Sequence, residues 1–324
     1  MTAVMGKARL RKEDPALLTG ENKFVDDIQA AGQLWMGMVR SPFAHATVGS
    51  ISTDEAKAMP GVHAVYTGTE LSEMGLWAAP LPCAWPVTPD MVNPPHFPAA
   101  TTEVHHVGKI VAVVLAETRY QAADAAELVE VDYTPLPVVA SVEDAVADAK
   151  VAHSEHETNK AFHWALEPNP DAVNDAFANA AHTVTGEFVQ QRLIPAAMEP
   201  RGVLAIPSPH GGELTLYSSS QVPHILKVMI AATTGISEAK LRIIAPSVGG
   251  GFGAKLNVNP DELLAVTLAN KLGLPVRWTE TRSEAAFSTH QGRGQRQKIE
   301  VAADADGKIA GVRVHLDADM GAYM

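Results

Sequence analysis

The chain has 324 residues, a length that predicts about two domains, each with its own hydrophobic core. Hydrophobic residues make up 46% of it and charged residues 19%, a globular balance that excludes extensive disorder. The net charge is −12 and Lys and Arg are scattered, which argues against a nucleic-acid or anionic membrane surface. Small molecules or proteins are the expected partners.

Two absences from the sequence limit its function further. Cys83 is the only cysteine, which excludes an internal disulfide framework and any four-thiolate zinc or iron–sulfur site. Electrons that leave this protein must therefore pass through another chain. Apolar runs of about 18 residues and a signal-peptide pattern are both missing, so we expect a cytoplasmic protein with no membrane span.

Residues from about Gly20 to Tyr133 alternate short strand patterns with alanine-rich helical patterns, which predicts a compact α+β unit and a first domain that ends near Ala140. The continuous apolar run Lys109–Ala116 is a predicted strand covered on both faces. Helical spacing occurs over Ser52–Met59 and Arg119–Val129. The segment Trp77–Pro98 holds seven prolines, too many for regular structure, and we expect a long surface excursion there.

The second half of the chain has a different pattern. Residues 141–180 are polar and weakly periodic, and we expect a linker. Strand patterns dominate 181–324, with helices predicted over Val222–Thr234 and Asp261–Leu272, the second capped by Asn259. Strand character continues to the last residues, so we expect this second domain to be incomplete. The predicted fold class is α+β.

The stretch LRIIAPSVGGGFGAK, residues 241–255, carries the strongest functional signal, because a predicted strand opens into a glycine-rich loop. Adjacent glycines adopt backbone angles closed to other residues, so successive amides can converge on one anion or metal-bound oxygen. We therefore predict that Gly250, Gly251, Phe252 and Gly253 approach a ligand, with Phe252 as a lid or a core plug. The alternative is a turn that only permits tight packing.

The same loop matches the dinucleotide fingerprint G-x-G-x-x-A, which would indicate an NAD-dependent dehydrogenase. In that fingerprint a helix begins within the glycines and faces the pyrophosphate. Here Lys255–Asn259 separates the loop from the predicted helix, and Glu280, the best acidic residue at a strand end, comes too late. NAD binding is therefore the weaker interpretation of this loop.

Two polar stretches have structural alternatives to a functional role. The sequence SSSQVPH, residues 218–224, places Gln221 between a strand and a helix. The hydroxyls of the three serines before it would also serve as helix caps. Met198–Gly202 contains Glu199 and Arg201, for which an interior ion pair at a chain turn is the simpler interpretation.

The thirteen histidines were considered as metal ligands. His105 and His106 are adjacent, so they would lie on opposite faces of a strand, and His153 and His156 lie in the predicted linker among acidic residues. Neither group offers a convincing ligand set, and isolated histidines are mostly structural. The sequence therefore predicts no metal ligand among its side chains.

Four motifs occur in an order that resembles a known family: RGVLAIP after MEP, SSSQVPH, SVGGGFGAK and PVRWTETRSEAAFSTHQGR. They resemble the molybdenum-binding large subunit of the xanthine dehydrogenase, aldehyde oxidase and carbon monoxide dehydrogenase family. RKEDPALLTGENKFVDDI and VGKIVAVVLAETRYQAADAAELVEVDYTPLP are similar to its hammerhead α/β domain. The resemblance implies a hammerhead domain over 1–140, a linker over 141–180 and the first part of a molybdopterin-binding domain over 181–324.

The function implied by this resemblance is part of a molybdenum hydroxylase, which oxidises an aldehyde or an N-heterocyclic carbon with oxygen derived from water. Its cofactor would be molybdenum–molybdopterin in the cytosine dinucleotide form. Gln221 would hydrogen-bond an oxygen ligand of molybdenum, while Gly251, Phe252 and Gly253 would present amides and a ring beside the metal ligands. Electrons would pass to an iron–sulfur small subunit and an FAD medium subunit.

The family's large subunit is much longer than this chain. The resemblance therefore implies that the catalytic glutamate and most pterin contacts belong to a C-terminal half beyond Met324. No residue here is assigned as the catalytic base, and we expect the isolated chain to be inactive. The lack of an acidic residue near Leu256 argues against purine recognition by that route. A non-catalytic fragment or assembly module without cofactor is the first alternative, and an NAD-dependent dehydrogenase is the second.

Overall fold

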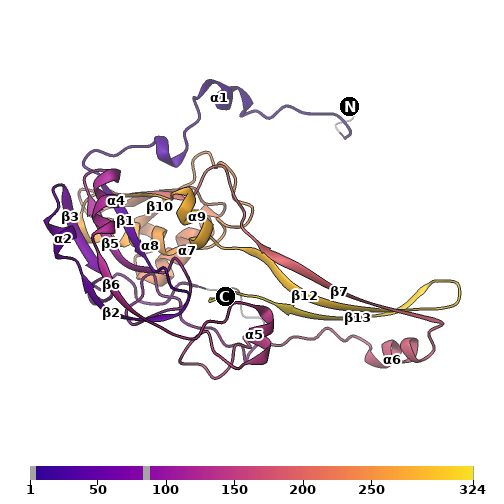
Figure 1. The fold of residues 1–324 in the computed structure, drawn as a ribbon. Helices are drawn as coiled ribbons and strands as arrows, with labels where there is room; N and C mark the ends of the chain where they lie inside the picture. The colour runs from indigo at the N-terminus through magenta and orange to yellow at the C-terminus, as the bar shows by residue number, and fades with distance from the viewer. Residues whose placement is uncertain (1–4, 83–87, 324) are drawn as a thin grey trace.

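The computed structural model describes residues 5–82 and 88–323, so Cys83 lies outside the described residues. The chain forms a body built on two sheets, and an arm of long strands projects from it (Figure 1). The N-terminal segment with α1 extends away from the body. None of the described helices combines the length and the apolar composition needed to cross a membrane.

Short helices alternate with strands through the first half of the chain, and the longest strands come later. The helices are α1 (Asp14–Thr19), η1 (Val25–Asp27), α2 (Asp54–Ala58), α3 (Gly68–Glu73), α4 (Arg119–Glu127), α5 (Val142–Ala147), α6 (Pro170–Ala178), α7 (Pro223–Thr234), η2 (Glu238–Lys240), α8 (Pro260–Leu272) and α9 (Arg282–Ser288). The strands are β1 (Leu34–Arg40), β2 (Ala46–Ser52), β3 (Val62–Thr67), β4 (Glu103–Val104), β5 (Ile110–Ala116), β6 (Glu130–Pro135), β7 (His182–Leu193), β8 (Gly202–Ile206), β9 (Leu214–Ser218), β10 (Leu241–Ile244), β11 (Val276–Thr279), β12 (Gly292–Ala303) and β13 (Ile309–Ala318).

The main sheet has seven strands in the order β10-β9-β8-β11-β1-β5-β3. β1 pairs parallel with β11 and antiparallel with β5, so this sheet continues across the junction between the two halves of the chain. Every residue of β5 is buried, which confirms the strand predicted from its unbroken apolar run. Helices packed on a mixed sheet confirm the α+β class.

Helix α8 covers one face of the main sheet, where it packs against β8, β9 and β11. Helix α7 lies beside it and packs against β10. Its start was predicted from Asn259 and Pro260, and the amide of Asn259 does donate to Glu262 Oε2 at 3.0 Å. Residues 261–269 are all buried, as expected of a helix with apolar residues on every side. On the opposite side, α4 packs against β1 and β5 beside the smaller sheet β4-β2-β6.

The arm consists of β7, β12 and β13, paired antiparallel (Figure 1). Helix α6, from the segment expected to be a linker, lies along it: the guanidinium of Arg313 stands 4.1 Å from the ring centroid of Phe177. Helix α5 is tied to β12 by an ion pair of 3.4 Å between Glu143 and Arg296. Residues 141–180 thus contain two short helices that contact the arm.

The proline-rich excursion is better anchored than its composition suggests. The side chains of Leu76 and Leu81 belong to the main hydrophobic core, and the amides of Ala78 and Ala79 donate to the carbonyl oxygen of Thr233. The first part of the segment does follow the surface, with Ala78, Pro80 and Pro82 exposed, but the buried Leu81 anchors it to the core. Prolines exclude regular structure, but they do not prevent the intervening leucines from being buried.

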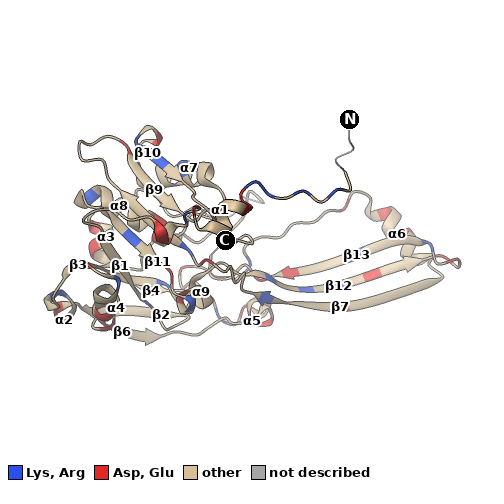
Figure 2. Cartoon of the chain, turned by 90° about the horizontal axis from the view of Figure 1, so that it is seen from above, with Lys and Arg blue, Asp and Glu red and all other residues tan. Residues whose placement is uncertain are grey.

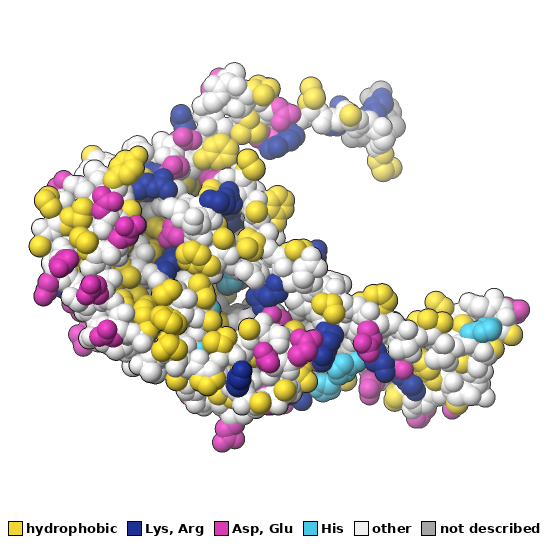
Figure 3. All heavy atoms as spheres, in the orientation of Figure 1, with side chains coloured by type: hydrophobic (Ala, Val, Ile, Leu, Met, Phe, Trp, Pro, Cys, Tyr) yellow, Lys and Arg dark blue, Asp and Glu magenta, His cyan; other side chains and the backbone are white. Residues whose placement is uncertain are grey.

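Charges are distributed unevenly along the chain but not gathered on the body. Basic side chains form a short run in the N-terminal segment, and elsewhere Lys and Arg alternate with Asp and Glu (Figure 2). On the face shown in Figure 3, basic, acidic and hydrophobic side chains are interspersed. That face presents no continuous basic stripe of the kind that binds a nucleic-acid backbone.

Candidate functional site

The glycine-rich loop follows β10 at the edge of the main sheet and leads to α8. Three of its residues have backbone angles in the left-handed region: Gly250 (φ 98°), Phe252 (φ 51°) and Gly253 (φ 95°). Glycine adopts this region without strain, whereas Phe252 does not. The ring of Phe252 is 76% exposed, so its interpretation as a core plug is wrong.

The loop does not have the geometry of a dinucleotide-binding turn. In that turn the helix N-terminus lies within the glycines and faces the pyrophosphate. Here α8 begins at Pro260, and the segment after Gly253 forms turns instead. The G-x-G-x-x-A match therefore lacks the helix start within the glycines that a dinucleotide-binding loop requires.

Gln221 braces one side of the loop. It lies just after β9, and its Oε1 accepts hydrogen bonds from the amides of Gly253 (3.1 Å) and Lys255 (3.3 Å). The backbone N–H of Gln221 donates to the carbonyl oxygen of Lys255 at 3.0 Å. Gly251 packs so closely against the Gln221 side chain that a Cβ would not fit. The Gly253 amide is thus engaged within the chain, although we expected it to face a ligand.

Glu199 braces the other side. Its Oε2 accepts from the amide of Gly249 at 2.7 Å and lies 3.1 Å from Lys255 Nζ, which also donates to the Glu199 carbonyl oxygen. A Cβ on Gly249 would collide with Glu199. Burial lowers the pKa of Lys255, and the neighbouring Glu199 charge opposes that effect. The carboxylate of Glu199 and the carboxamide of Gln221 therefore hold the loop in one shape.

Three consecutive amides of the loop are left without an acceptor. Within residues 5–82 and 88–323, the N–H groups of Gly250, Gly251 and Phe252 donate to no protein atom. Gly251 is buried and lines a cavity of about 200 Å³, whose other walls come from residues 194–201 and α9. A buried amide without an acceptor is costly, so the Gly251 donor suits an anionic or strongly electron-rich oxygen, and the more exposed amides of Gly250 and Phe252 lie on either side of it in the chain.

A buried ion network lies beneath the cavity. Arg201 contacts Glu280 at 2.6 Å and Asp261 at 2.9 Å, whereas Glu199 pairs with Lys255. The expectation of an ion pair within Met198–Gly202 is therefore wrong, because both charged residues of that stretch pair with residues distant in the sequence. Burial by itself would raise the pKa of Glu280, but the charge and hydrogen bonds of Arg201 outweigh it and lower that pKa. Burial raises the pKa of Asp261. Arg201 is thus held in place by two carboxylates and itself lines the cavity.

The serines before Gln221 do not cap helix α7, contrary to the simpler interpretation of that stretch. The helix begins at Pro223 without a side-chain cap. Ser218 instead donates to Glu262 Oε1 at 2.5 Å, and Ser219 Oγ accepts from the amide of Gly202 at 3.1 Å. Burial raises the pKa of Glu262 to about 7. These serines join β9 to α8 and β8 and so position the strand end that carries Gln221.

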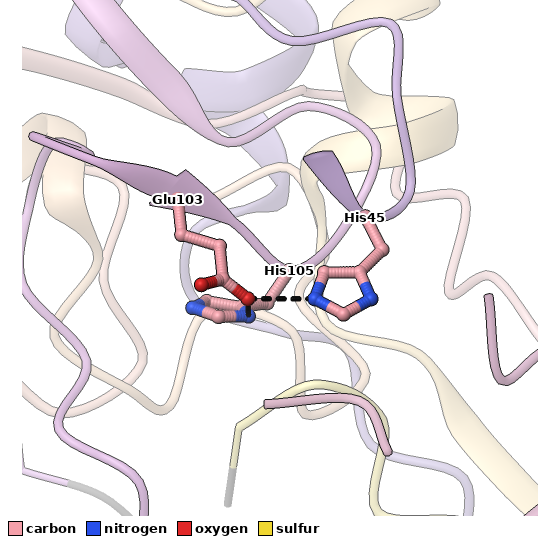
Figure 4. A group of neighbouring side chains, drawn as sticks. All are labelled: His45, Glu103 and His105. Carbon is pink, nitrogen blue, oxygen red and sulfur yellow. Dashed lines mark hydrogen bonds and ion pairs between the residues drawn. The ribbon is translucent and has the colours of Figure 1, made fainter. Parts of the chain in front are cut away.

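A second group of polar side chains was not predicted from the sequence. His45, Glu103 and His105 point toward one another (Figure 4), with Glu103 Oε1 2.6 Å from His45 Nε2 and 3.6 Å from His105 Nδ1. The ring of His153 stacks on that of His105 with centroids 4.0 Å apart. Burial lowers the pKa of His105 to about 4. The signal available was the spacing of Glu103 and His105, two apart on one strand face.

Comparison with known proteins gives an independent view of both halves. A family model described as the molybdopterin cofactor-binding domain matches residues 141–324. A second, the a/b hammerhead domain of aldehyde oxidase and xanthine dehydrogenase, matches residues 19–137. The chain is 39% identical to the carbon monoxide dehydrogenase large chain of Hydrogenophaga pseudoflava and 36% identical to the nicotine 6-hydroxylase large subunit of Paenarthrobacter nicotinovorans, over 96% and 99% of its length.

Solved structures agree with these relatives. Quinoline 2-oxidoreductase from Pseudomonas putida 86 superposes with a TM-score of 0.90 over 98% of the chain, at 33% identity. A Cu,Mo-containing CO dehydrogenase superposes with a TM-score of 0.86 over 96% of the chain, at 34% identity. The chain covers only 38–40% of the length of each of these four relatives.

Proposed function

Because the chain belongs to the family of molybdenum-binding large subunits of xanthine dehydrogenase, aldehyde oxidase and carbon monoxide dehydrogenase, we propose that it builds one wall of a molybdopterin site in a hydroxylase. The reaction would oxidise an aldehyde or an N-heterocyclic carbon with water-derived oxygen. The hammerhead domain and the molybdopterin cofactor-binding domain are both represented.

The row of amides at Gly250, Gly251 and Phe252 is the observation that carries this proposal. Their N–H groups find no acceptor in the described part of the chain, and Gly251 borders the cavity. The donors are neutral and fixed, which suits the oxygen-rich ligands of a molybdenum centre. The residues present therefore fit such a cofactor.

The chain's own contribution is to bind and orient. When bound, the cofactor supplies the two-electron oxidation of the substrate carbon. Gly250, Gly251 and Phe252 would donate to its oxygens, and the Nε2 of Gln221, which has no acceptor among the described residues, would add a further donor. Because Gln221 and Glu199 hold the loop before any ligand arrives, these donors need little reorganisation.

Substrate and partners follow from the relatives by analogy. Relatives named for nicotine and quinoline support an N-heterocyclic substrate, and a relative named for carbon monoxide represents the other chemistry in this group. We propose the cytosine dinucleotide form of the cofactor, a C-terminal half of the molybdenum subunit, an iron–sulfur small subunit and an FAD medium subunit. The single Cys83 agrees with electrons leaving through another chain.

The direct test is analysis of the protein purified with every chain that accompanies it. We expect about one molybdenum and one pterin nucleotide per chain, together with iron–sulfur and flavin chains identified by mass spectrometry. Turnover of an aldehyde or N-heterocycle without molybdenum would overturn the proposal. A folded assembly that takes up neither molybdenum nor pterin when both are supplied would instead support a non-catalytic assembly module.

A further inference from the structure

The paired strands β2 and β4 bring together His45, Glu103 and His105. Ala46 is paired with Val104 and Thr47 with Glu103. His45 directly precedes β2 and His105 directly follows β4, so both histidines lie at the same end of the strand pair. Side chains alternate along a strand, which places Glu103 and His105 on one face. The pairing of β2 with β4 therefore brings the three groups in Figure 4 together.

The spacing of their donor atoms is that of a metal-ligand set. One nitrogen or carboxylate oxygen from each residue lies within 4.8 Å of the other two. A zinc ion bound at about 2.0–2.2 Å in tetrahedral geometry holds its ligand atoms about 3.4 Å apart. The observed 2.6 Å and 3.6 Å from Glu103 Oε1 to the two imidazoles bracket that value, so small side-chain movements would admit an ion.

The backbone beside His45 orients its imidazole as expected for a ligand. His45 Nδ1 lies 2.6 Å from the carbonyl oxygen of Pro137, which can only accept, so Nδ1 donates to it, while Nε2 lies 2.6 Å from Glu103 Oε1. A metal ion between Nε2 and Glu103 would take the place of the proton in that contact. A carbonyl partner on the far nitrogen is the usual environment of a metal-binding histidine. In His105 the arrangement differs, because Nδ1 lies 3.0 Å from the carbonyl oxygen of Ala152 and also 3.6 Å from Glu103 Oε1, so an ion bound by this nitrogen would replace the Ala152 contact. Ser154 donates to Glu103 Oε1 at 2.8 Å.

We propose that His45, Glu103 and His105 bind one divalent transition-metal ion of the zinc class. Imidazole and carboxylate ligands suit this class, and water would complete the coordination. The ion would join the β2–β4 pair and, through the hydrogen bond from Ser154 to Glu103, the following segment. The cavity beside the glycine-rich loop is lined by other residues, so this site is independent of the proposed molybdopterin site.

The test compares metal binding by the wild-type assembly, after dialysis against a chelator, with that of three variants. Zn²⁺ affinity is measured by calorimetry and Co²⁺ binding by its visible absorption spectrum. The variants Glu103→Gln and His105→Gln each remove one ligand while keeping similar volume. The variant His210→Gln removes an exposed histidine outside the cluster and serves as the matched control.

We expect wild type and His210→Gln to bind one equivalent of each metal, with the intense visible bands of four-coordinate cobalt. Glu103→Gln and His105→Gln should bind at least tenfold more weakly. Equal binding by all four proteins, or wild-type binding without those bands, would overturn the proposal. Circular dichroism checks folding; if both ligand variants fail to fold, the wild-type stoichiometry and cobalt spectrum decide the question alone.

Discussion

Gln221 and Gly253 lie 32 positions apart in the sequence and are joined by a hydrogen bond of 3.1 Å from the glycine amide to the carboxamide oxygen. The same oxygen accepts from Lys255. The shape of the glycine-rich loop therefore depends on a side chain carried by the end of β9. Glycines make the loop possible, and Gln221 selects one of its conformations.

The two chemical groups of Gln221 can be separated by substitution. Gln221→Glu keeps an oxygen acceptor for the amides of Gly253 and Lys255 but removes the Nε2 donor, whereas Gln221→Ala removes both. We expect Gln221→Glu to retain slow hydrogen exchange at these amides but to lose molybdenum or activity. Gln221→Ala should lose both properties. Full activity and molybdenum content in Gln221→Glu would exclude the donor role.

Gly251 should not tolerate a methyl group. A Cβ there would collide with the Gln221 side chain, which cannot move away without breaking its hydrogen bonds to two amides. We expect Gly251→Ala to cost about 1–3 kcal/mol in the free energy of unfolding, measured in urea, and to lower the molybdenum content. Gly292→Ala is the control, because open space surrounds that position. Equal stability of the two variants would contradict the packing argument.

The buried ion pair between Arg201 and Glu280 should be sensitive to the loss of one partner. Glu280→Gln leaves Asp261 as the ion-pair partner of the guanidinium among the described residues. Breaking such a buried pair costs about 3–5 kcal/mol, and the remaining carboxylate places our expectation at the lower end. Glu300→Gln, at a half-exposed contact of 3.7 Å to Lys298, should change stability by less than about 1 kcal/mol. Comparable losses in both variants would refute this ranking.

Glu262 should make stability depend on pH. Its pKa is raised by burial from 4.5 to about 7, so the folded protein binds its proton more tightly than the unfolded chain does. The stabilisation from this group is present below about pH 4.5, falls as the pH rises through about 7 and is then lost. Glu262→Gln mimics the neutral acid, since its amide can donate to Ser218 while its oxygen accepts from Asn259.

The measurement is the free energy of unfolding in urea across that pH range. The wild type should lose stability relative to Glu262→Gln as the pH rises, while the variant of an exposed carboxyl, Glu238→Gln, should follow the wild type. A constant difference between wild type and Glu262→Gln at every pH would show that Glu262 does not titrate in this way.

Local signals predicted the elements that depend on local physics. The apolar run of β5 and the Asn259–Pro260 start of α8 were both recognised, because burial on two faces and helix capping leave a mark within a few residues. The burial of Leu81 was not recognised, since it depends on the distant core that covers it. The pairing of β1 with β11 was equally inaccessible.

By itself the sequence determined the family, the glycine-rich loop and the approach of Gln221 to it, because these are carried by ordered motifs. Only the tertiary structure decided which loop amides find no acceptor among the described residues, that Gly253 is bonded to Gln221, and that His45 meets Glu103 and His105. The physical reason is that hydrogen-bond satisfaction and ligand convergence are set by strand register and side-chain packing between segments distant in sequence. No local spacing records that register.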